Sequence, residues 1–151
     1  MQKTPASNGT PSDSATRAWI DMMRTQKLLL DRIEQDLRQA GLPPLGWYDV
    51  LLELWRADDG RLRPLEIERR TLLAQYNLSR LLNRLEREGL IEFQAFDDDG
   101  RGKWAAITKR GRQVREAMWA VYGASIRRHV EAKLSEAEAV KLSALLAKLS
   151  T

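Results

Sequence analysis

The sequence predicts a mainly α-helical fold with one small β-hairpin, and three features of the chain support this. Residues 13–40 and 109–150 repeat apolar side chains at the spacing of long helices. Residues 64–88 divide into a short helix, a turn and a second helix. Two short segments with strand-like patterns, 90–93 and 103–108, flank a run of aspartates and glycines that is typical of a turn. We therefore expect a winged helix-turn-helix, with the hairpin as its wing.

Composition excludes several classes of function. The 151 residues are enough for one domain with a hydrophobic core. The chain has no cysteine and a single histidine, so neither a disulfide framework nor a cysteine or histidine metal cluster is expected. No glycine-rich phosphate loop and no Ser/His/Asp arrangement is evident. We expect a protein that is not an enzyme and that needs no cofactor and no metal.

The N-terminal residues 1–12 are mainly Ser, Thr, Pro, Asn and Gly, a composition that favours a disordered tail. They lack the basic start and apolar centre of a secretory signal. No segment approaches the roughly 18 consecutive apolar residues of a membrane span. We expect a cytoplasmic protein with no membrane partner.

The first helix is expected over residues 13–40, because Gly41 and Pro43-Pro44 interrupt the periodic pattern there. A second helix over residues 45–57 follows. We expect Arg61-Leu62-Arg63 to form a short strand that pairs with the wing. The first helix is too long for one small lobe to cover, so part of its apolar stripe needs another partner.

A helix-turn-helix needs an apolar contact between its two helices. We expect this contact from Leu65, Leu72 and Leu73 on one side and from Leu78 and Leu82 on the other. Ala74 occupies the position expected for the N-cap of the second helix, where Ser, Thr, Asp or Asn would cap better.

The second helix has an apolar face and an unusually polar opposite face. Leu78, Leu81, Leu82 and Leu85 follow the i, i+3, i+4, i+7 spacing. The residues predicted to contact DNA are Gln75, Tyr76, Asn77, Ser79, Arg80, Asn83 and Arg84. Arg, Asn and Gln can form bidentate contacts with base edges and also bind phosphates. A solvated helix face is the alternative, but residues 69–87 contain five arginines against one glutamate, which favours a nucleic-acid surface.

The predicted wing contains three consecutive aspartates, which would repel phosphate. A calcium loop is excluded, because Arg101 and Thr108 occupy the fifth and twelfth positions counted from Asp97. We expect Asp99 to pair with a nearby arginine and shape the wing. Arg101 and Lys103 would then reach the minor groove or the flanking DNA backbone.

The C-terminal part predicts two further helices. The first covers residues 109–132, and the second begins at Ser135, with Glu138 completing a capping box. With the first helix, they carry more apolar surface than the helix-turn-helix can cover. We therefore expect residues 13–44 and 109–151 to form the dimerisation region of a homodimer and residues 45–108 to bind double-stranded DNA.

The motifs in the centre of the chain resemble those of the MarR family of bacterial transcription regulators. The segment Ser79–Ile91, with the sequence SRLLNRLEREGLI, carries the resemblance. Asp99-x-Arg101 followed by Ile107-Thr108-x-x-Gly111 has the spacing of the family's wing. The resemblance covers residues 14–150. It implies a triangular dimer joined through the terminal helices.

The same resemblance implies a ligand site. In that family, small aromatic or phenolic effectors bind between the first two helices, the helix after the wing and the DNA-binding lobe. The residues placed near such a pocket are Trp19, Trp47, Tyr48, Asp49 and Trp119. A urate-responsive branch carries a Gly-Trp-Asp run, whereas this chain has an extra residue in Gly46-Trp47-Tyr48-Asp49. Structural packing is the alternative role for these aromatic residues.

The expected function is a sequence-specific transcriptional regulator, a repressor released from a palindromic operator by a small aromatic or phenolic ligand. Two alternatives remain open. A winged-helix module could bind protein instead of DNA, and a regulator could act without a ligand. His129, near the end of a long helix, is expected at the surface or in an interface, where the helix dipole would stabilise its charge.

Overall fold

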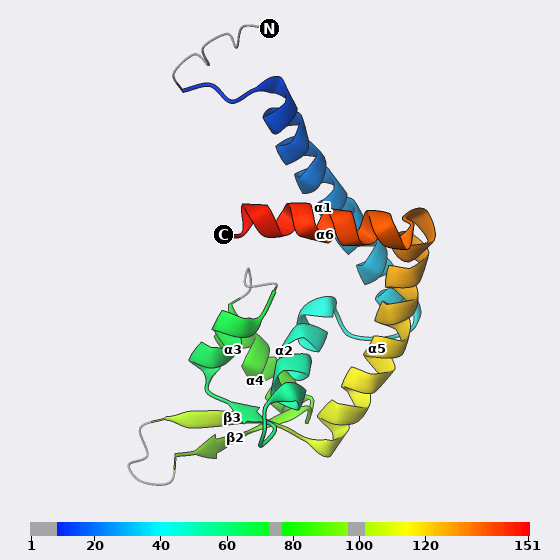
Figure 1. Ribbon diagram of the computed structural model, residues 1–151. Coiled ribbons are helices and arrows are strands. Elements are labelled where there is room, and N and C mark those ends of the chain that lie inside the picture. Colours follow the sequence, from blue (N-terminus) through cyan, green and yellow to red (C-terminus); the bar gives the residue numbers. More distant parts are fainter. Residues whose placement is uncertain (1–8, 73–76, 97–101) are drawn as a thin grey trace, which may run out of the picture.

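The computed structural model describes residues 9–72, 77–96 and 102–151. It has a pair of long helices, a compact lobe and a further helix at the C-terminal end (Figure 1). The long helices α1 (Asp13–Gln39) and α5 (Lys109–His129) pack against each other, and the lobe is formed by the chain between them. This architecture confirms the predicted mainly helical winged helix-turn-helix.

Local signals in the sequence set the ends of the first two helices. The Ser12 side chain caps the start of α1. After α1, Gly41 adopts a φ of 71°, the left-handed conformation that commonly follows a helix. The next helix, α2 (Leu45–Arg56), is tied to α1 by a 2.9 Å hydrogen bond from the Leu45 amide to Glu34 Oε1. α1 therefore contacts the start of the lobe directly.

A three-stranded antiparallel sheet forms the wing and its base. The strands are β1 (Arg61–Leu62), β2 (Ile91–Ala95) and β3 (Lys103–Ile107), and their order is β1-β3-β2. Arg61 lies opposite Ala106, and Gln94 lies opposite Trp104. Because side chains alternate along a strand, these four residues share one face of the sheet. The short strand predicted at residues 61–63 is confirmed.

The helix-turn-helix consists of α3 (Pro64–Arg70) and α4 (Leu78–Arg87). The predicted contact through Leu65 and Leu72 is wrong, because these side chains are 56% and 86% exposed. Ile67 is fully buried instead. α3 has only seven residues, so Leu65 falls on its outer side, and Leu72 follows its last turn. Leu73, also predicted in this contact, lies outside the described residues.

The lobe has its own hydrophobic core beneath the sheet. Its buried members come from α2, the sheet and both helices of the helix-turn-helix. They are Val50, Leu51, Leu54, Leu62, Ile67, Leu82, Leu85, Leu90, Ile91, Ala105 and Ile107. A second cluster joins the lobe to the long helices and consists of Ile33, Leu37, Leu45, Tyr48 and Met118. Two small cores meet along α2, which contributes to both.

The wing and α5 are joined through Thr108. Its hydroxyl donates a 2.6 Å hydrogen bond to the Gly89 carbonyl and accepts a 3.0 Å bond from the Gly111 amide. Its own amide donates to the Leu90 carbonyl at 3.1 Å. A Cβ atom on Gly111 would overlap that same carbonyl oxygen. The first turn of α5 therefore lies directly against the chain that leaves α4.

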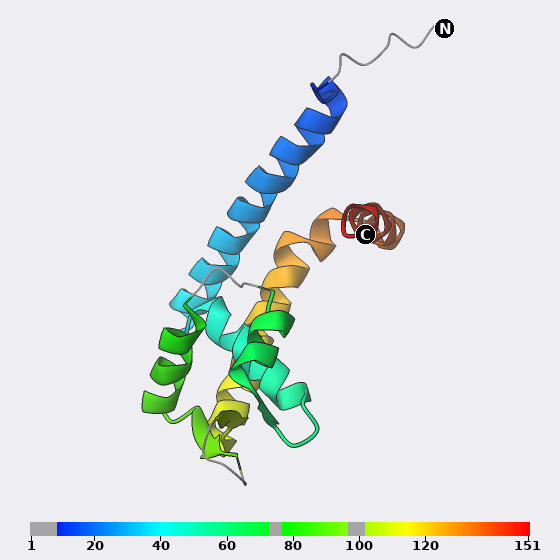
Figure 2. The same ribbon diagram turned by 90° about the vertical axis from the view of Figure 1, so that its left-hand side faces the viewer.

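The C-terminal helices extend beyond the lobe (Figure 2). α5 ends at His129 rather than at the predicted residue 132, and a 3-10 turn, η1 (Glu131–Lys133), follows it. α6 (Glu136–Leu149) begins with the predicted capping box between Ser135 and Glu138. The bonds from Ser135 lower the pKa of Glu138. No residue of α6 is buried.

None of the helices in residues 9–72, 77–96 and 102–151 combines the length and the apolar character needed to cross a membrane.

Candidate nucleic-acid interface

α4 separates apolar and polar residues on opposite sides, as the sequence predicted. Leu82 and Leu85 are buried in the lobe core at 2% and 0% exposure. The four predicted DNA contacts that lie within the helix are exposed: Ser79, Arg80, Asn83 and Arg84. One side of the helix thus anchors it, while a hydroxyl, an amide and two guanidinium groups project from the other side.

Asn77 lies at the start of this helix rather than within it. Its side-chain oxygen accepts a 3.3 Å hydrogen bond from the Arg80 amide, which makes Asn77 the N-cap. The expected cap at Ala74 is therefore wrong. The N-cap position is occupied by Asn77, a residue type that caps helices better than alanine does. Gln75 and Tyr76 lie outside the described residues. The cap fixes the first turn, which carries Ser79 and Arg80.

The two arginines differ in their surroundings. Arg84 Nε lies 3.4 Å from Glu88 Oε1, and both side chains are roughly half exposed. Such an exposed pair contributes little and can exchange for a phosphate. Within the described part of the chain, Arg80 has no ion pair shorter than 4.0 Å. Arg80 can therefore bind an external group without breaking an ion pair.

The wing places a second cation beside the helix-turn-helix. Lys103 begins β3 and is exposed, with its Nζ 4.9 Å from the centre of the Phe93 ring. The aromatic ring holds the ammonium group on the inner face of the hairpin without neutralising it. The other predicted wing residues, Asp99 and Arg101, lie outside the described residues.

The opposite face of the wing contains an arginine–aromatic cluster that the sequence patterns did not predict. The Arg61 guanidinium lies 4.6 Å from the Trp104 ring centre. Arg63 lies 4.6 Å from the Phe96 ring centre and 5.2 Å from that of Trp104. The two rings meet edge to face at 5.3 Å. One available signal was the Arg-Leu-Arg pattern of residues 61–63, in which the buried leucine directs its neighbours outward.

The predicted ligand residues do not all converge. Tyr48 stacks on Trp119 at 6.1 Å and meets Tyr122 edge to face at 5.2 Å. Burial raises the pKa of both tyrosines. Asp49 is 7% exposed and accepts a 2.8 Å hydrogen bond from the Leu72 amide. These residues connect α2, α5 and the end of α3.

Trp47 and Trp19 lie elsewhere. Trp47 packs against the lobe core and lines a hollow of about 290 Å³ together with Arg110 and Val114 of α5. Trp19 is 60% exposed in the N-terminal half of α1, and no ring contact joins it to Tyr48 or Trp119. The structure therefore groups Tyr48 with Trp119 and separates both from Trp47.

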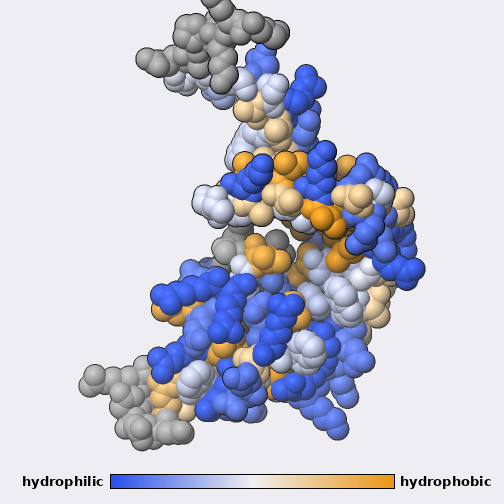
Figure 3. All heavy atoms as spheres, in the orientation of Figure 1, coloured by the Kyte–Doolittle hydropathy of each residue, from blue (hydrophilic) through white to orange (hydrophobic). Residues whose placement is uncertain are grey.

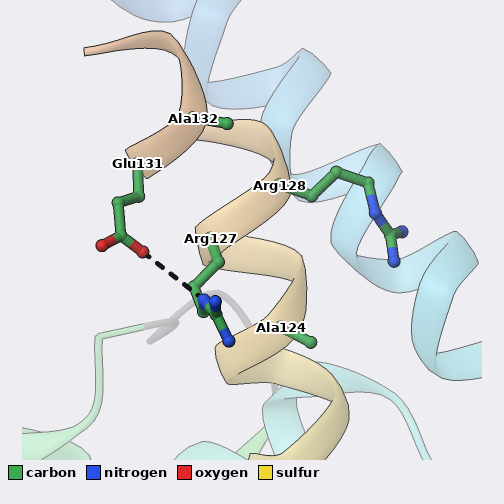
Figure 4. A pocket seen from close by; sticks show the side chains of 5 residues that line it. All are labelled: Ala124, Arg127, Arg128, Glu131 and Ala132. Atoms are coloured by element: carbon green, nitrogen blue, oxygen red, sulfur yellow. Dashed lines mark ion pairs between the residues drawn. The ribbon is translucent and has the colours of Figure 1, made fainter. Parts of the chain in front are cut away.

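A second hollow, of about 400 Å³, lies where α5 meets η1. Arg127 and Arg128 project from its walls, with Glu131 nearby (Figure 4). Arg127 pairs with Glu131 at 3.7 Å, whereas Arg128 turns to Asp36 at 3.3 Å. Its cations thus already have carboxylate partners. Across the described segments, no cluster of His, Asp and Glu is suited to hold a metal ion.

Asp36 is the centre of a polar contact between α1 and α5. Its Oδ2 accepts a 2.6 Å bond from the Ser125 hydroxyl and lies 3.0 Å from His129 Nε2. The Ser125 bond lowers the pKa of Asp36, and His129 and Arg128 act in the same direction. His129 is an interhelix contact, with its side chain only 14% exposed. Ser125, His129 and Asp36 do not form a catalytic relay, because both side chains bond to the carboxylate and not to each other.

Comparisons with known proteins agree with this geometry. Residues 40–102 match the sequence profile of the MarR family, a segment that includes α2, the helix-turn-helix and β2. No curated protein gives a significant sequence match.

Solved structures show the same fold over nearly the whole chain. Sco3205 from Streptomyces coelicolor, a MarR family regulator in complex with DNA, has a TM-score of 0.83 and 21% identity, covering 96% of this chain and 91% of that one. AbsC from the same organism has a TM-score of 0.78 and 24% identity, with coverages of 93% and 95%. BpsR from Bordetella bronchiseptica, whose DNA binding is regulated by 6-hydroxynicotinic acid, has a TM-score of 0.78 and 20% identity, with coverages of 93% and 98%.

Proposed function

We propose that this chain is a winged-helix regulator of the MarR type, which represses transcription as a homodimer bound to a palindromic operator. The exposed polar face of α4 carries the proposal. Its leucines are buried in the lobe, so Arg80, Asn83 and Arg84 are held on a rigid helix facing outward. Guanidinium and amide groups in this arrangement can read base edges in a major groove. Lys103 on the wing adds a contact to the flanking backbone.

The proposed dimer uses α1 and α6, which carry much of the exposed apolar surface. The residues of α6 that remain exposed are Val140, Leu142, Leu145, Leu146 and Leu149. On α1 they are Trp19, Ile20, Met23 and Leu28. Hydrophobic atoms gather on the side where α6 lies, while the lobe surface is mainly hydrophilic (Figure 3). A two-fold partner would cover these residues and place two α4 helices about one DNA turn apart.

The proposed ligand is a small aromatic or phenolic molecule that binds beside Tyr48 and Trp119 and releases the DNA. This site lies where α2 and α5 pack, so a ligand there contacts both the lobe and the dimerisation region. A ligand that binds one spacing of the two lobes more tightly weakens DNA binding by that difference in affinity. Loss of release in a Trp119→Leu variant with unchanged DNA affinity would support this position.

The first test is binding to the DNA upstream of the protein's own gene, titrated at several salt concentrations beside scrambled DNA. A site-specific regulator should bind its operator at least about a thousandfold more tightly than scrambled DNA. The logarithm of its affinity should fall with the logarithm of salt concentration by about 0.9 per phosphate contacted. Weak and equal binding to both DNAs would contradict the proposal for this operator and favour a protein-binding module.

Two substitutions on α4 sharpen this test. Arg80→Ala should reduce the preference for operator over scrambled DNA, because a base contact supplies about 1–3 kcal/mol of discrimination. Arg84→Ala should weaken binding to both DNAs alike if Arg84 binds phosphate. Arg17→Ala, which removes an exposed arginine from α1, is the matched control and should leave both affinities unchanged. Equal affinities for all variants would contradict DNA contact by α4.

A further inference from the structure

We propose that Arg63, Phe96 and Trp104 form a clamp that fixes the direction in which the wing leaves the helix-turn-helix. In this proposal they are positioning residues, and they act on DNA through the wing cations rather than by touching DNA themselves. The inference rests on the proposed DNA-binding function.

The clamp joins three segments that are distant in the sequence. Arg63 lies between β1 and α3 and occupies the N-cap position of α3. Phe96 follows the last residue of β2, and Trp104 is the second residue of β3. The Arg63 guanidinium lies within 5.2 Å of both ring centres. One side chain at the start of the helix-turn-helix therefore contacts both sides of the hairpin at its outer end, where β2 ends and β3 begins.

Two further contacts hold the rings in place. Arg61 lies over Trp104 and also donates a 3.2 Å hydrogen bond to Gln94 Oε1, which ties β1 to β2 across β3. Gly102 allows the Phe96 ring to lie across the returning strand, because a Cβ at residue 102 would overlap that ring. The Phe96 amide donates a 3.1 Å bond to the Gly102 carbonyl. Ring and backbone thus join the outer ends of β2 and β3.

A wing needs such a support because an isolated two-stranded hairpin is only marginally stable in water. β2 and β3 extend away from α3 and α4 (Figure 1). A small change in the angle of these strands displaces Lys103 relative to α4. Since α4 and the wing must meet DNA at the same time, the clamp sets whether both can bind in one register.

Direct phosphate binding by Arg63 would predict different behaviour. An arginine whose role is its charge can be replaced by lysine, whereas a guanidinium that packs against two aromatic rings at once cannot. Phe96 carries no charge, so its removal can change the salt dependence of binding only through other residues. Arg63→Lys and Phe96→Leu therefore separate positioning from direct contact without altering the net charge.

The experiment measures operator affinity and its salt dependence for wild type, Arg63→Lys, Phe96→Leu and Lys103→Gln. Lys103→Gln removes a wing cation and should lower the salt slope by about 0.9 for each phosphate that the protein no longer neutralises. Phe96→Leu and Arg63→Lys should lower the slope by a similar amount and weaken binding roughly tenfold. Adding Lys103→Gln to Phe96→Leu should cost little more, because the effects of residues that act through the same interaction are not additive.

Trp55→Leu is the matched control. Trp55 also lies under an arginine, with the Arg115 guanidinium 4.0 Å from its ring, but on α2 away from the wing. This change removes the same kind of contact and should leave both operator affinity and salt slope unchanged.

A second measurement requires no DNA. Hydrogen exchange of the Phe96 amide should become at least tenfold faster in Arg63→Lys, while amides of α4 keep their wild-type rates. This also reports on the clamp if Phe96→Leu fails to fold.

The outcomes separate this inference from the proposed function. Wild type that fails to bind its operator specifically would overturn the proposed function, and the clamp's DNA role with it, even if exchange shows that the contact supports the wing. Specific wild-type binding with unchanged affinity and slope in Phe96→Leu and Arg63→Lys would overturn the inference alone. Weaker binding with an unchanged slope would also overturn it, because the wing cations would then still reach DNA. A fully additive reduction in the double variant would do the same.

Discussion

α4 and α6 have similar apolar patterns but different surroundings. In α4, Leu82 and Leu85 are almost completely buried, and the polar side faces out. In α6, Leu145 and Leu149 are 49% and 66% exposed, although both recur at helical spacing. The lobe satisfies the apolar face of α4 within one chain. α6 is stabilised locally by its capping box, and its apolar face is exposed.

This difference indicates which helix can move. α4 is held in the lobe core, so it travels with the lobe as one body. α6 and the outer part of α1 contribute little to that core and are suited to set the distance between two copies. In the proposed dimer, we expect DNA affinity to change through the spacing of the two lobes rather than through unfolding of α4.

The largest expected effect tests the buried side of the comparison. Leu85→Ala should lower the free energy of unfolding by about 2–5 kcal/mol, because it removes a fully buried side chain and leaves a cavity. Urea unfolding followed by circular dichroism measures this change. A cost below about 1 kcal/mol would show that the lobe core does not anchor α4.

The next effect concerns the contact between α1 and α5. Asp36→Asn should lower the free energy of unfolding at neutral pH by about 1.5–3 kcal/mol, the range for hydrogen bonds to charged groups. Because the pKa of Asp36 is lowered in the folded protein, its contribution is complete above the ordinary value of 3.8 and is lost as the pH falls through the folded-state pKa. The groups facing it are Ser125, Arg128 and His129.

Urea unfolding between pH 7 and pH 3 measures this dependence. The difference between wild type and Asp36→Asn should shrink in the acid range. Asp31→Asn, an exposed change on the same helix, is the control and should stay within about 0.5 kcal/mol of wild type at each pH. A pH-independent difference would mean that the carboxylate charge is not involved.

Leu145→Ala tests the exposed side of the comparison and matches Leu85→Ala in chemistry. It should raise the dimer dissociation constant at least about tenfold, equivalent to about 1.4 kcal/mol, because both copies lose apolar surface at the interface. Sedimentation over a range of concentrations measures this constant. An unchanged constant would place the dimer contact elsewhere.

The smallest effects come from the two helix caps. Asn77→Ala should lower the free energy of unfolding by about 1 kcal/mol, because it removes the cap of a helix that belongs to the core. Ser135→Ala removes the equivalent bond from α6 and should mainly weaken the dimer. Unfolding at several protein concentrations separates the two. A concentration-dependent destabilisation in Asn77→Ala would contradict the separation of lobe and dimer regions.

Periodicity and capping residues predicted most of the fold. Gly41, Ser135 and the Asp-Gly turn placed helix and strand ends within a few residues. The prediction of the buried side of α3 was wrong because seven residues give too few turns to define a face. The buried Ile67 could therefore not be distinguished from the exposed Leu65. The wrong N-cap followed from starting α4 too early.

The candidate site was predicted less completely, and the reason is geometric. The exposed face of α4 followed from its leucine spacing. The ligand residues did not, since adjacent positions on a helix point about 100° apart, which sends Trp47 and Tyr48 to different sides of α2. The contact of Arg63 with Trp104 depends on strand register, and that of Asp36 with Ser125 joins residues 89 positions apart. Local sequence patterns carry no information about either of these long-range contacts.

The close approach of Gly111 to the Leu90 carbonyl makes this residue the fulcrum of a lever. α5 has 21 residues, so it reaches about 30 Å from that point. A methyl group at residue 111 would act as a wedge at the short end, and the resulting tilt would grow along the helix toward its far end. The absence of a side chain at residue 111 thereby sets the direction of the α5 axis.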